Sequence, residues 1–284
     1  MTVREALILG RKKLRKVGIP NPSLDAELIL SHILAIDRFK LLVDDEIKLT
    51  QEQLNNYKDL LQQRCKFIPV AYITGRKEFY GLDFYIKPGV LIPRPETEFV
   101  VDEALKAIAT NKNPLIADLC CGSGAISVAL AFNNKRAKVY ASDISDVACE
   151  VARINVNLFG LENRVFLLFG DLWSPFKERN IRGFDVVVSN PPYIPEHELN
   201  KLPNDVKNEP QVALNGGVDG LDFYRKIVTD VSEFLKPGGT IIFEIGWDQG
   251  AKVKALLKDT GFCNVNIVKD YAGFDRVVTG IYCK

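Results

Sequence analysis

Hydrophobic periodicity divides the chain into a helical beginning and an alternating remainder. In roughly the first seventy residues, apolar side chains recur every three or four positions, which is the spacing of one buried helix face. Leu7 and Leu14 share such a face, and a second helix is expected to begin at Asn21–Ser23, with a proline near its first position. Thr50, with Gln53 three residues later, predicts a capping box at a further helix. This part of the chain therefore predicts a small helical bundle.

The pattern changes near Pro69. Residues 71–90 are rich in aromatic residues and glycine, and they predict two strands joined by a turn near Gly81. After Pro114, short apolar runs alternate with helical stretches, as expected of strands that are buried on both faces. The expected strands are Leu115–Leu119, Lys138–Ser142, Val165–Phe169, Phe184–Ser189, Thr240–Ile245, Asn264–Val268 and Arg276–Tyr282. The alternation predicts an α/β fold with a doubly wound, largely parallel sheet.

Composition narrows the classes of protein that fit this pattern. With 284 residues, of which 47% are hydrophobic and 26% charged, the chain has the profile of a folded globular protein. It lacks an apolar run of about 18 residues and a secretory leader, so a cytoplasmic protein without membrane contact is expected. Its net charge of +1 disfavours non-specific nucleic-acid binding. Six cysteines without a C-x-x-C pair, and only two histidines, disfavour a metal site and predict free thiols.

The first candidate for ligand binding follows the first buried strand, where residues 118–125 read D-L-C-C-G-S-G-A. In open α/β sheets, ligands bind outside the carboxyl ends of the strands. Gly122 and Gly124 would let a ligand approach the backbone closely. A dinucleotide fingerprint needs Gly or Ala where Ser127 stands, and no G-K-[ST] follows. The loop is therefore expected to hold a nucleoside ligand that lacks a pyrophosphate.

Carboxylates end the next two strands, and each has two interpretations. Asp143 is placed either to accept hydrogen bonds from ribose hydroxyls or to cap the helix that begins near Ser145. Asp171 is placed either to accept a hydrogen bond from an adenine amino group or to form a turn. In the first case, Leu172 would supply an N–H and an apolar contact. The charged stretch Arg94–Glu98 either caps a helix or lines a site.

The most informative stretch, Ser189–Tyr193, follows the fourth strand and reads S-N-P-P-Y. Two prolines end the strand ladder and stiffen the chain, and the residue before them is biased toward an extended conformation. The Pro191 carbonyl is presented without a neighbouring N–H, beside the Oδ1 atom of Asn190. These two oxygens predict a rigid pair of acceptors for an NH₂ group, and Tyr193 offers a ring face for a planar amide or base.

Together these motifs resemble class I S-adenosylmethionine-dependent methyltransferases, and N-P-P-Y resembles the signature of those that methylate planar nitrogens. Leu235–Gly239, between a helix and a strand, is also typical of that fold. Further stretches resemble the release-factor glutamine methyltransferase family along nearly the whole chain; they are Tyr72–Gly75, Glu78–Gly81, Leu91–Glu98 and Asp219–Arg225. The resemblance implies a Rossmann-like domain of seven strands. It also implies methyl transfer from S-adenosylmethionine, leaving S-adenosylhomocysteine, to the side-chain nitrogen (N5) of the glutamine in the Gly-Gly-Gln motif of class I release factors.

The resemblance also assigns roles to residues and to parts of the chain. The implied cofactor contacts are Cys120, Cys121, Gly122, Ser123, Gly124, Asp143, Asp171, Leu172 and Asn190. Asn190, Pro191, Pro192 and Tyr193 are expected to hold the glutamine, with Asn190, Pro191 and Tyr193 as the catalytic residues. The family usually has Gly-Thr in place of Cys120-Cys121, which puts the backbone contacts to the amino-acid end of the cofactor in doubt. Residues 1–74 are expected to form a substrate-recognition bundle, 75–95 a hairpin linker and 96–284 the methyltransferase domain.

Three alternatives remain open at this point. A related glutamine methyltransferase that acts on a ribosomal protein has very similar site motifs and differs mainly in its N-terminal region and its substrate. A nucleic-acid adenine-N6 or cytosine-N4 methyltransferase uses the same pair of acceptors, but base flipping calls for a basic surface that a net charge of +1 disfavours. The intact N-P-P-Y motif disfavours a non-catalytic cofactor-binding module. The expected partner is thus a release factor rather than a nucleic acid, and the expected state is a monomer.

Overall fold

The computed structural model describes the backbone of all 284 residues and every side chain except that of Leu42. Its residues separate into two compact units: residues 1–76 with 203–208, and residues 77–202 with 209–284. Within the described residues, no helix is both long and apolar enough to cross a membrane.

The first unit is a bundle of helices, as predicted. Its helices are α1 (Val3–Lys16), α2 (Pro22–Leu34), α3 (Arg38–Val43), α4 (Gln51–Arg64) and α5 (Val70–Thr74). The predicted capping box is confirmed, because Thr50 N donates to Gln53 Oε1 at 2.9 Å and Gln53 N donates to Thr50 Oγ1 at 3.2 Å. Leu14 and Tyr57 are fully buried in the core of the bundle.

The second unit contains a seven-stranded sheet in the order β5-β4-β3-β6-β7-β9-β8. The strands are β3 (Leu115–Leu119), β4 (Lys138–Asp143), β5 (Val165–Phe169), β6 (Phe184–Ser189), β7 (Leu235–Glu244), β8 (Phe262–Lys269) and β9 (Asp275–Tyr282). The first five strands run parallel, and β9 is antiparallel to both of its neighbours. This arrangement confirms the predicted α/β fold with a doubly wound sheet.

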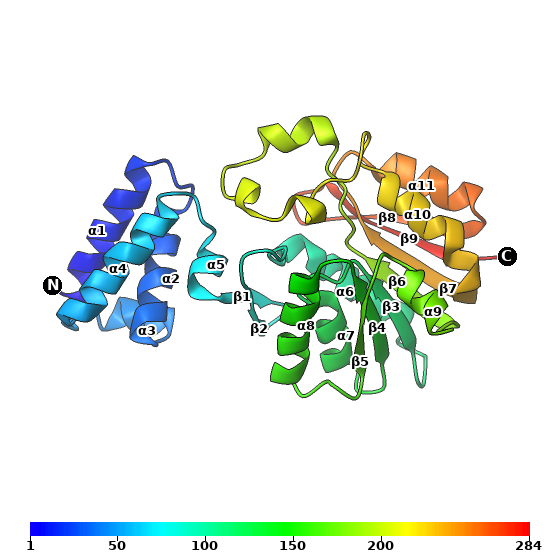
Figure 1. Ribbon diagram of the computed structural model, residues 1–284, viewed down its shortest axis with the longest axis horizontal. Coiled ribbons are helices and arrows are strands. Elements are labelled where there is room, and N and C mark those ends of the chain that lie inside the picture. The colour runs from blue at the N-terminus through cyan, green and yellow to red at the C-terminus, as the bar shows by residue number, and fades with distance from the viewer. The chain divides into compact units, whose positions relative to one another are not determined.

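Helices cover both faces of this sheet (Figure 1). One group is α6 (Glu98–Ala107), α7 (Ala125–Asn133) and α8 (Asp146–Leu158), and the other is α9 (Ser174–Glu178), α10 (Asp222–Asp230) and α11 (Gly250–Asp259). Short 3₁₀ helices lie in the connections: η1 (Pro95–Thr97), η2 (Glu196–Lys201), η3 (Val206–Asn208), η4 (Gln211–Ala213) and η5 (Val231–Glu233). Because the parallel strands end at one edge, the loops that follow them meet there.

The predicted hairpin is also present, as β1 (Arg76–Phe79) and β2 (Leu82–Tyr85). The buried side chain of Asn155, on α8, holds its second strand by accepting from Tyr85 N at 2.8 Å and donating to Tyr85 O at 3.1 Å. The same amide donates to Ser123 O at 2.9 Å. One asparagine therefore ties the hairpin to the glycine loop that follows β3.

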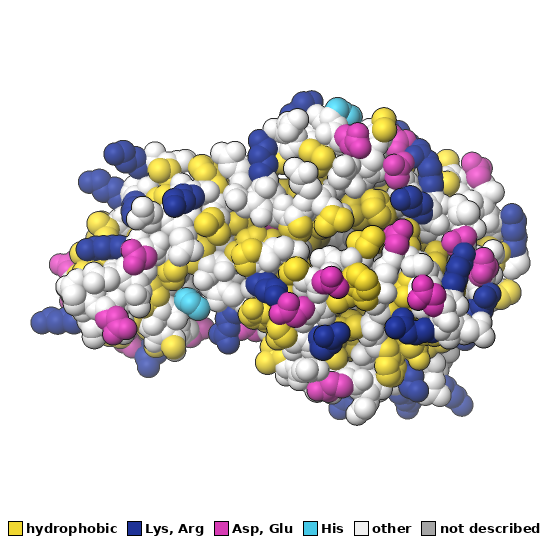
Figure 2. Space-filling view, viewed as in Figure 1, with side chains coloured by type: hydrophobic (Ala, Val, Ile, Leu, Met, Phe, Trp, Pro, Cys, Tyr) yellow, Lys and Arg dark blue, Asp and Glu magenta, His cyan; other side chains and the backbone are white. Residues whose placement is uncertain are grey.

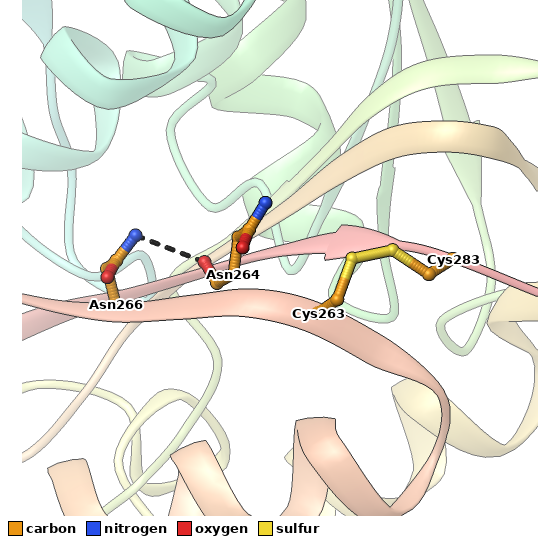
Figure 3. Close-up of a disulfide and its surroundings, with 4 residues drawn as sticks. All are labelled: Cys263, Asn264, Asn266 and Cys283. Atoms are coloured by element: carbon orange, nitrogen blue, oxygen red, sulfur yellow. Dashed lines mark hydrogen bonds between the residues drawn. A yellow bond between two sulfur atoms is a disulfide. The ribbon is translucent and has the colours of Figure 1, made fainter.

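Two expectations need correction. The strand expected from Thr240 begins at Leu235, because Leu235 already pairs with Phe184 before a register shift in the ladder. The expectation of free thiols is wrong for Cys263 and Cys283, which form a disulfide (Figure 3). The antiparallel pairing of β8 with β9 brings their Cα atoms to 6.0 Å, within the range of a disulfide, although 20 positions separate them in the sequence.

Candidate active site

A pocket of about 870 Å³ of empty space, open to solvent, lies where β3, β4 and β6 end. Its wall includes seven residues that the sequence analysis had assigned to the site: Cys120, Gly122, Asp143, Asp171, Leu172, Asn190 and Pro192. Five assigned residues are not among those that line it, although each lies within one or two positions of a lining residue in the sequence: Cys121, Ser123, Gly124, Pro191 and Tyr193. Hydrophobic side chains gather along a hollow on the visible face of this unit (Figure 2).

The glycine loop after β3 leaves room at the pocket. Gly122 and Gly124 have φ angles of +56° and +77°, in the left-handed region that favours glycine. A Cβ atom on Gly122 would meet open space, whereas one on Gly124 would lie 3.2 Å from the Cβ of Ala152 on α8. Gly124 therefore permits the close packing of loop and helix, and Gly122 keeps the pocket floor bare. Cys120 adopts a φ of +61° although it is not glycine.

Asp143 presents a fixed carboxylate at the end of β4. Its Oδ2 accepts from Gly122 N at 2.8 Å and its Oδ1 from Ser145 N at 2.9 Å. The cap of α8 is Ser145, whose Oγ accepts from Ala148 N, so the interpretation of Asp143 as the cap is wrong. Burial raises the pKa of Asp143, and the hydrogen bonds from Ser145 and Gly122 oppose that rise. The carboxylate keeps lone pairs for further donors in the pocket.

The loop after β5 is tied to the end of β4. Gly170 N donates to Asp143 O at 3.0 Å, and Ser142 Oγ donates to Leu172 O at 3.0 Å. Leu172 has a φ of +44°, so this stretch is a tight turn as well as part of the pocket wall. The exposed Asp171 and the partly buried Asp143 consequently border one pocket.

Asn190, which follows β6, has a side chain held by one hydrogen bond. Its Nδ2 donates to Thr97 Oγ1 at 3.2 Å. Because the amide nitrogen is engaged there, Oδ1 is the atom left for a ligand in the pocket that Asn190 lines. Tyr193 lies against the core instead of the pocket, and its hydroxyl donates to Glu244 Oε1 at 3.3 Å.

Glu244 contacts Tyr193 and lies next to Thr97, the residue that accepts from Asn190. The sequence analysis did not identify it. It ends β7 with 1% of its surface exposed, accepts a hydrogen bond from the Tyr193 hydroxyl, and lies next to the hydroxyl of Thr97. Its Oε2 has no hydrogen-bond partner among the described residues. Burial raises the pKa of Glu244 to about 7, and the bond from Thr97 and the charge of Arg276 oppose the rise. A charged residue ending the apolar run I-I-F-E-I was the sequence clue.

A second buried carboxylate, Glu209, holds the opposite wall. It accepts from Ile92 N at 3.0 Å and pairs with the guanidinium of Arg94. Val90 and Leu91 on one side, and Pro210, Val212 and Ala213 on the other, line the pocket next to this pair. Among the described residues that line the pocket, none belongs to the charged stretch Arg94–Glu98; Arg94 contacts Glu209, Thr97 contacts Asn190, and Glu98 begins α6. Pro210–Ala213 carried no recognisable motif.

We predict that buried Asp118 makes stability depend on pH. It is fully buried, accepts from Ser127 Oγ at 2.6 Å, and burial raises its pKa to about 7. The native state thus binds the proton more tightly than the unfolded chain, so the free energy of unfolding should fall as pH rises from about 4 to 7. Asp118→Asn should remove a decrease on the order of 3 kcal/mol, measured by urea denaturation across this range. An unchanged slope in the variant would contradict the assignment.

Comparisons with known proteins agree with this geometry. The family model for the PrmC N-terminal domain matches residues 5–75, and that for the methyltransferase small domain matches residues 100–209. The chain is 43% identical to a release factor glutamine methyltransferase of Clostridium acetobutylicum, over 99% of each chain. It is 42% identical to one of Moorella thermoacetica, over 97% of each.

Solved structures show the same fold. The hMettl16 catalytic domain, solved in complex with the MAT2A 3′UTR hairpin 6, has a TM-score of 0.60 at 16% identity, over 80% of this chain and 83% of that one. A methyltransferase from Pyrococcus furiosus has a TM-score of 0.53 at 19% identity, over 73% and 92%. At these identities the likeness establishes the fold alone.

Proposed function

The chain belongs to the release factor glutamine methyltransferase family, and we propose that it transfers a methyl group from S-adenosylmethionine to the side-chain N5 of the glutamine in the Gly-Gly-Gln motif of class I peptide chain release factors. One observation assigns this reaction to the pocket described above. Asn190, whose Oδ1 has no hydrogen-bond partner among the described residues, lines the same pocket as Asp143 and Asp171. An acceptor for an NH₂ group therefore borders a pocket whose carboxylates suit a cationic nucleoside.

The pocket residues fit S-adenosylmethionine, which when bound supplies a methyl group on a positively charged sulfur. Asp143 would accept from the ribose hydroxyls, and Asp171 from the adenine amino group beside the apolar side chain of Leu172. The backbone of Cys120–Gly124 would hold the amino-acid end, where Gly122 leaves open space. Two carboxylates at one pocket favour a cationic ligand over an anionic one.

The substrate amide needs orientation, because its nitrogen lone pair is delocalised into the carbonyl. Asn190 Oδ1 and the Pro191 carbonyl would each accept one N–H of that amide, Pro192 would form part of the substrate wall, and Tyr193 would support the motif from the core side. The two oxygens fix the direction of the nitrogen and stabilise the positive charge that develops on it. Such positioning contributes about 7–11 kcal/mol in favourable cases. Attack by the neutral amide nitrogen would give an N-methylated amide cation, which is acidic enough to lose its proton afterwards, so no general base is required before attack.

Glu244 determines which end of the Asn190 amide faces the pocket. A hydrogen bond from the Thr97 hydroxyl to this neighbouring carboxylate would leave the Thr97 oxygen as the acceptor for Asn190 Nδ2, which donates to it at 3.2 Å. That bond in turn leaves Asn190 Oδ1 for the substrate. Tyr193 donates to the same carboxylate. Glu244 is thus a positioning residue for two side chains of the N-P-P-Y motif.

We predict that Glu244→Gln lowers kcat about tenfold, as expected when an electrostatic contact is misaligned rather than removed. The amide of the introduced glutamine would donate to the Thr97 oxygen. The Thr97 hydroxyl would then donate to Asn190, which favours the Asn190 rotamer with Oδ1 facing Thr97 and Nδ2 facing the pocket. Cofactor affinity, measured by calorimetry, should not change. Thr97→Ser, which keeps the hydroxyl, should retain activity that Thr97→Val loses. A wild-type kcat in Glu244→Gln would refute this positioning role.

Residues 1–74 are proposed to recognise the release factor, since a helical unit offers a surface that matches a protein partner. Their match to the PrmC N-terminal domain model supports this role. A monomer acting in the cytoplasm, where translation terminates, is proposed as the working state.

Methyl transfer from labelled cofactor to purified substrates tests the proposed function. A class I release factor should be labelled, whereas ribosomal protein, DNA and ribosomal RNA at equal concentrations should not. Preferential labelling of the ribosomal protein would favour the related glutamine methyltransferase. Preferential labelling of a nucleic acid would indicate a base methyltransferase, and labelling of none would contradict the proposal.

A further inference from the structure

Four aromatic side chains gather in the second unit, where β7 ends and where β8 turns into β9. Tyr271 is 97% exposed, Trp247 65% and Phe274 51%, whereas Phe99 is half-buried. They form two ring pairs: Phe99 with Tyr271, at 4.9 Å between centroids, and Trp247 with Phe274, at 6.3 Å. Single exposed apolar residues are ordinary on a protein surface, but paired exposed rings that share one turn of the chain, as Tyr271 and Phe274 do, are candidates for a binding site. We call these four residues the aromatic surface.

Hydrogen bonds hold the backbone beneath the aromatic surface. The Asp270 carboxylate accepts from Ala272 N and Phe274 N, both at 3.0 Å, and from Arg276 at 3.1 Å. Asp270 N donates to Phe274 O at 2.9 Å and closes the turn. A surface that is rigid before binding loses little conformational entropy when a partner arrives.

Two hydrogen-bonded residues, Thr97 and Gln249, connect the aromatic surface to the N-P-P-Y motif. Phe99 lies two residues after Thr97, which receives the hydrogen bond from Asn190. On the other side, Trp247 stands in a turn fixed by Gln249, whose Nε2 donates to Tyr193 O at 2.9 Å. Both ring pairs are therefore connected by short stretches of chain to the N-P-P-Y motif. Because β9 pairs antiparallel with β7, the β8–β9 turn lies at the edge of the sheet where β7 ends, which is also the edge where the N-P-P-Y motif follows β6.

Charge indicates the kind of segment that fits. Lys269 pairs with Asp275 at 3.2 Å, and Arg276 pairs with Asp270 at 3.1 Å, so both cations of this hairpin are neutralised. A nucleic-acid strand stacks on aromatic rings only where a positive groove also follows its phosphates. Exposed rings beside neutralised cations instead suit an uncharged polypeptide, and small residues let its peptide groups lie close to the ring faces.

We propose that the aromatic surface binds the uncharged, glycine-containing loop of the release factor on either side of the target glutamine. The inference rests on the proposed function, and it adds a substrate contact outside the pocket. Such a contact positions the loop and contributes to substrate affinity; it takes no part in binding the cofactor.

The test uses the full chain, purified release factor and S-adenosylmethionine. Trp247→Ala and Tyr271→Ala should each raise the KM for the release factor about tenfold, the effect of one aromatic hot spot, with kcat and cofactor affinity unchanged. Tyr271→Phe, which keeps the ring, should behave as wild type. Phe132→Ala is the matched control. Phe132 is an aromatic residue with 46% of its surface exposed, and it lies near the C-terminal end of α7, the end away from the glycine loop.

The outcomes separate this inference from the proposed function. If wild type methylates the release factor and both alanine variants keep its KM, the docking role is overturned and the proposed function stands. A loss of kcat at unchanged KM also overturns docking. Docking is likewise overturned if size-exclusion chromatography shows that wild type is a dimer and that the substitutions act only by dissociating it. If wild type does not methylate the release factor at all, the proposed function itself fails.

Discussion

Replacing Asn190 with alanine should lower kcat for glutamine methylation by about two to three orders of magnitude, comparable to the loss of one preorganised transition-state contact. The variant loses the Oδ1 acceptor that is proposed to hold the amide, while the Pro191 carbonyl remains. The side chain is only partly buried, and its one hydrogen bond in the structure, to Thr97, is 3.2 Å long. Folding and cofactor affinity should therefore change little, so the loss should lie in turnover.

Ser189→Ala provides the matched control for that experiment. Ser189 is adjacent, and its buried Oγ donates to Leu119 O at 2.6 Å, so its removal should cost about 1 kcal/mol of stability. It offers no acceptor to a substrate, and kcat should stay near that of wild type. Initial rates with saturating cofactor, together with melting temperatures, distinguish the two variants. A near-normal rate for Asn190→Ala would show that the pair of acceptors does not act on the substrate.

Replacing Asp143 with alanine should weaken S-adenosylmethionine binding by about two orders of magnitude or more. Each hydrogen bond to a charged acceptor contributes about 1.5–3 kcal/mol, and two ribose hydroxyls are proposed to use this carboxylate. The variant also loses the acceptor that holds Gly122 N at 2.8 Å, so the glycine loop is less well fixed. Isothermal titration calorimetry measures the dissociation constant directly.

Asp146→Ala tests whether charge alone accounts for such a loss. Asp146 is exposed in the first turn of α8, three residues after Asp143, and it does not line the pocket. Its replacement removes the same formal charge, yet cofactor affinity should change by less than about threefold, as for a surface charge. Equal losses of cofactor affinity in the two variants would mean that Asp143 acts only through its negative charge and not through hydrogen bonds to the cofactor.

Much of the fold was predictable because buried parallel strands leave short apolar runs. The runs at Leu115–Leu119, Val165–Phe169 and Phe184–Ser189 match the observed strands at both ends. The start of β7 was missed, because Leu235–Gly239 has the glycines and the proline of a turn and joins the ladder only through pairing with Phe184. The disulfide was missed for a similar reason, since register between two strands places its cysteines together.

The part of the site that follows strand ends was also predictable. Asp143 ends a strand, Asn190 directly follows one and Asp171 comes two residues after one, and the topology of parallel strands brings such residues to one edge. Glu244 and Glu209 were not predicted, because their roles depend on partners far away in the sequence. Glu244 meets Tyr193 and Thr97, and Glu209 meets Arg94, only after the chain has folded.

Mass spectrometry of a class I release factor incubated with enzyme and S-adenosylmethionine tests the central claim most directly. The account predicts that one peptide, the one containing Gly-Gly-Gln, gains the mass of a CH₂ group. Fragmentation should place this group on the glutamine side chain, and Asn190→Ala should give almost none of it in the same time. A modification on another residue, or an equal yield from Asn190→Ala, would contradict the claim that Asn190 and Pro191 hold the glutamine amide for methylation.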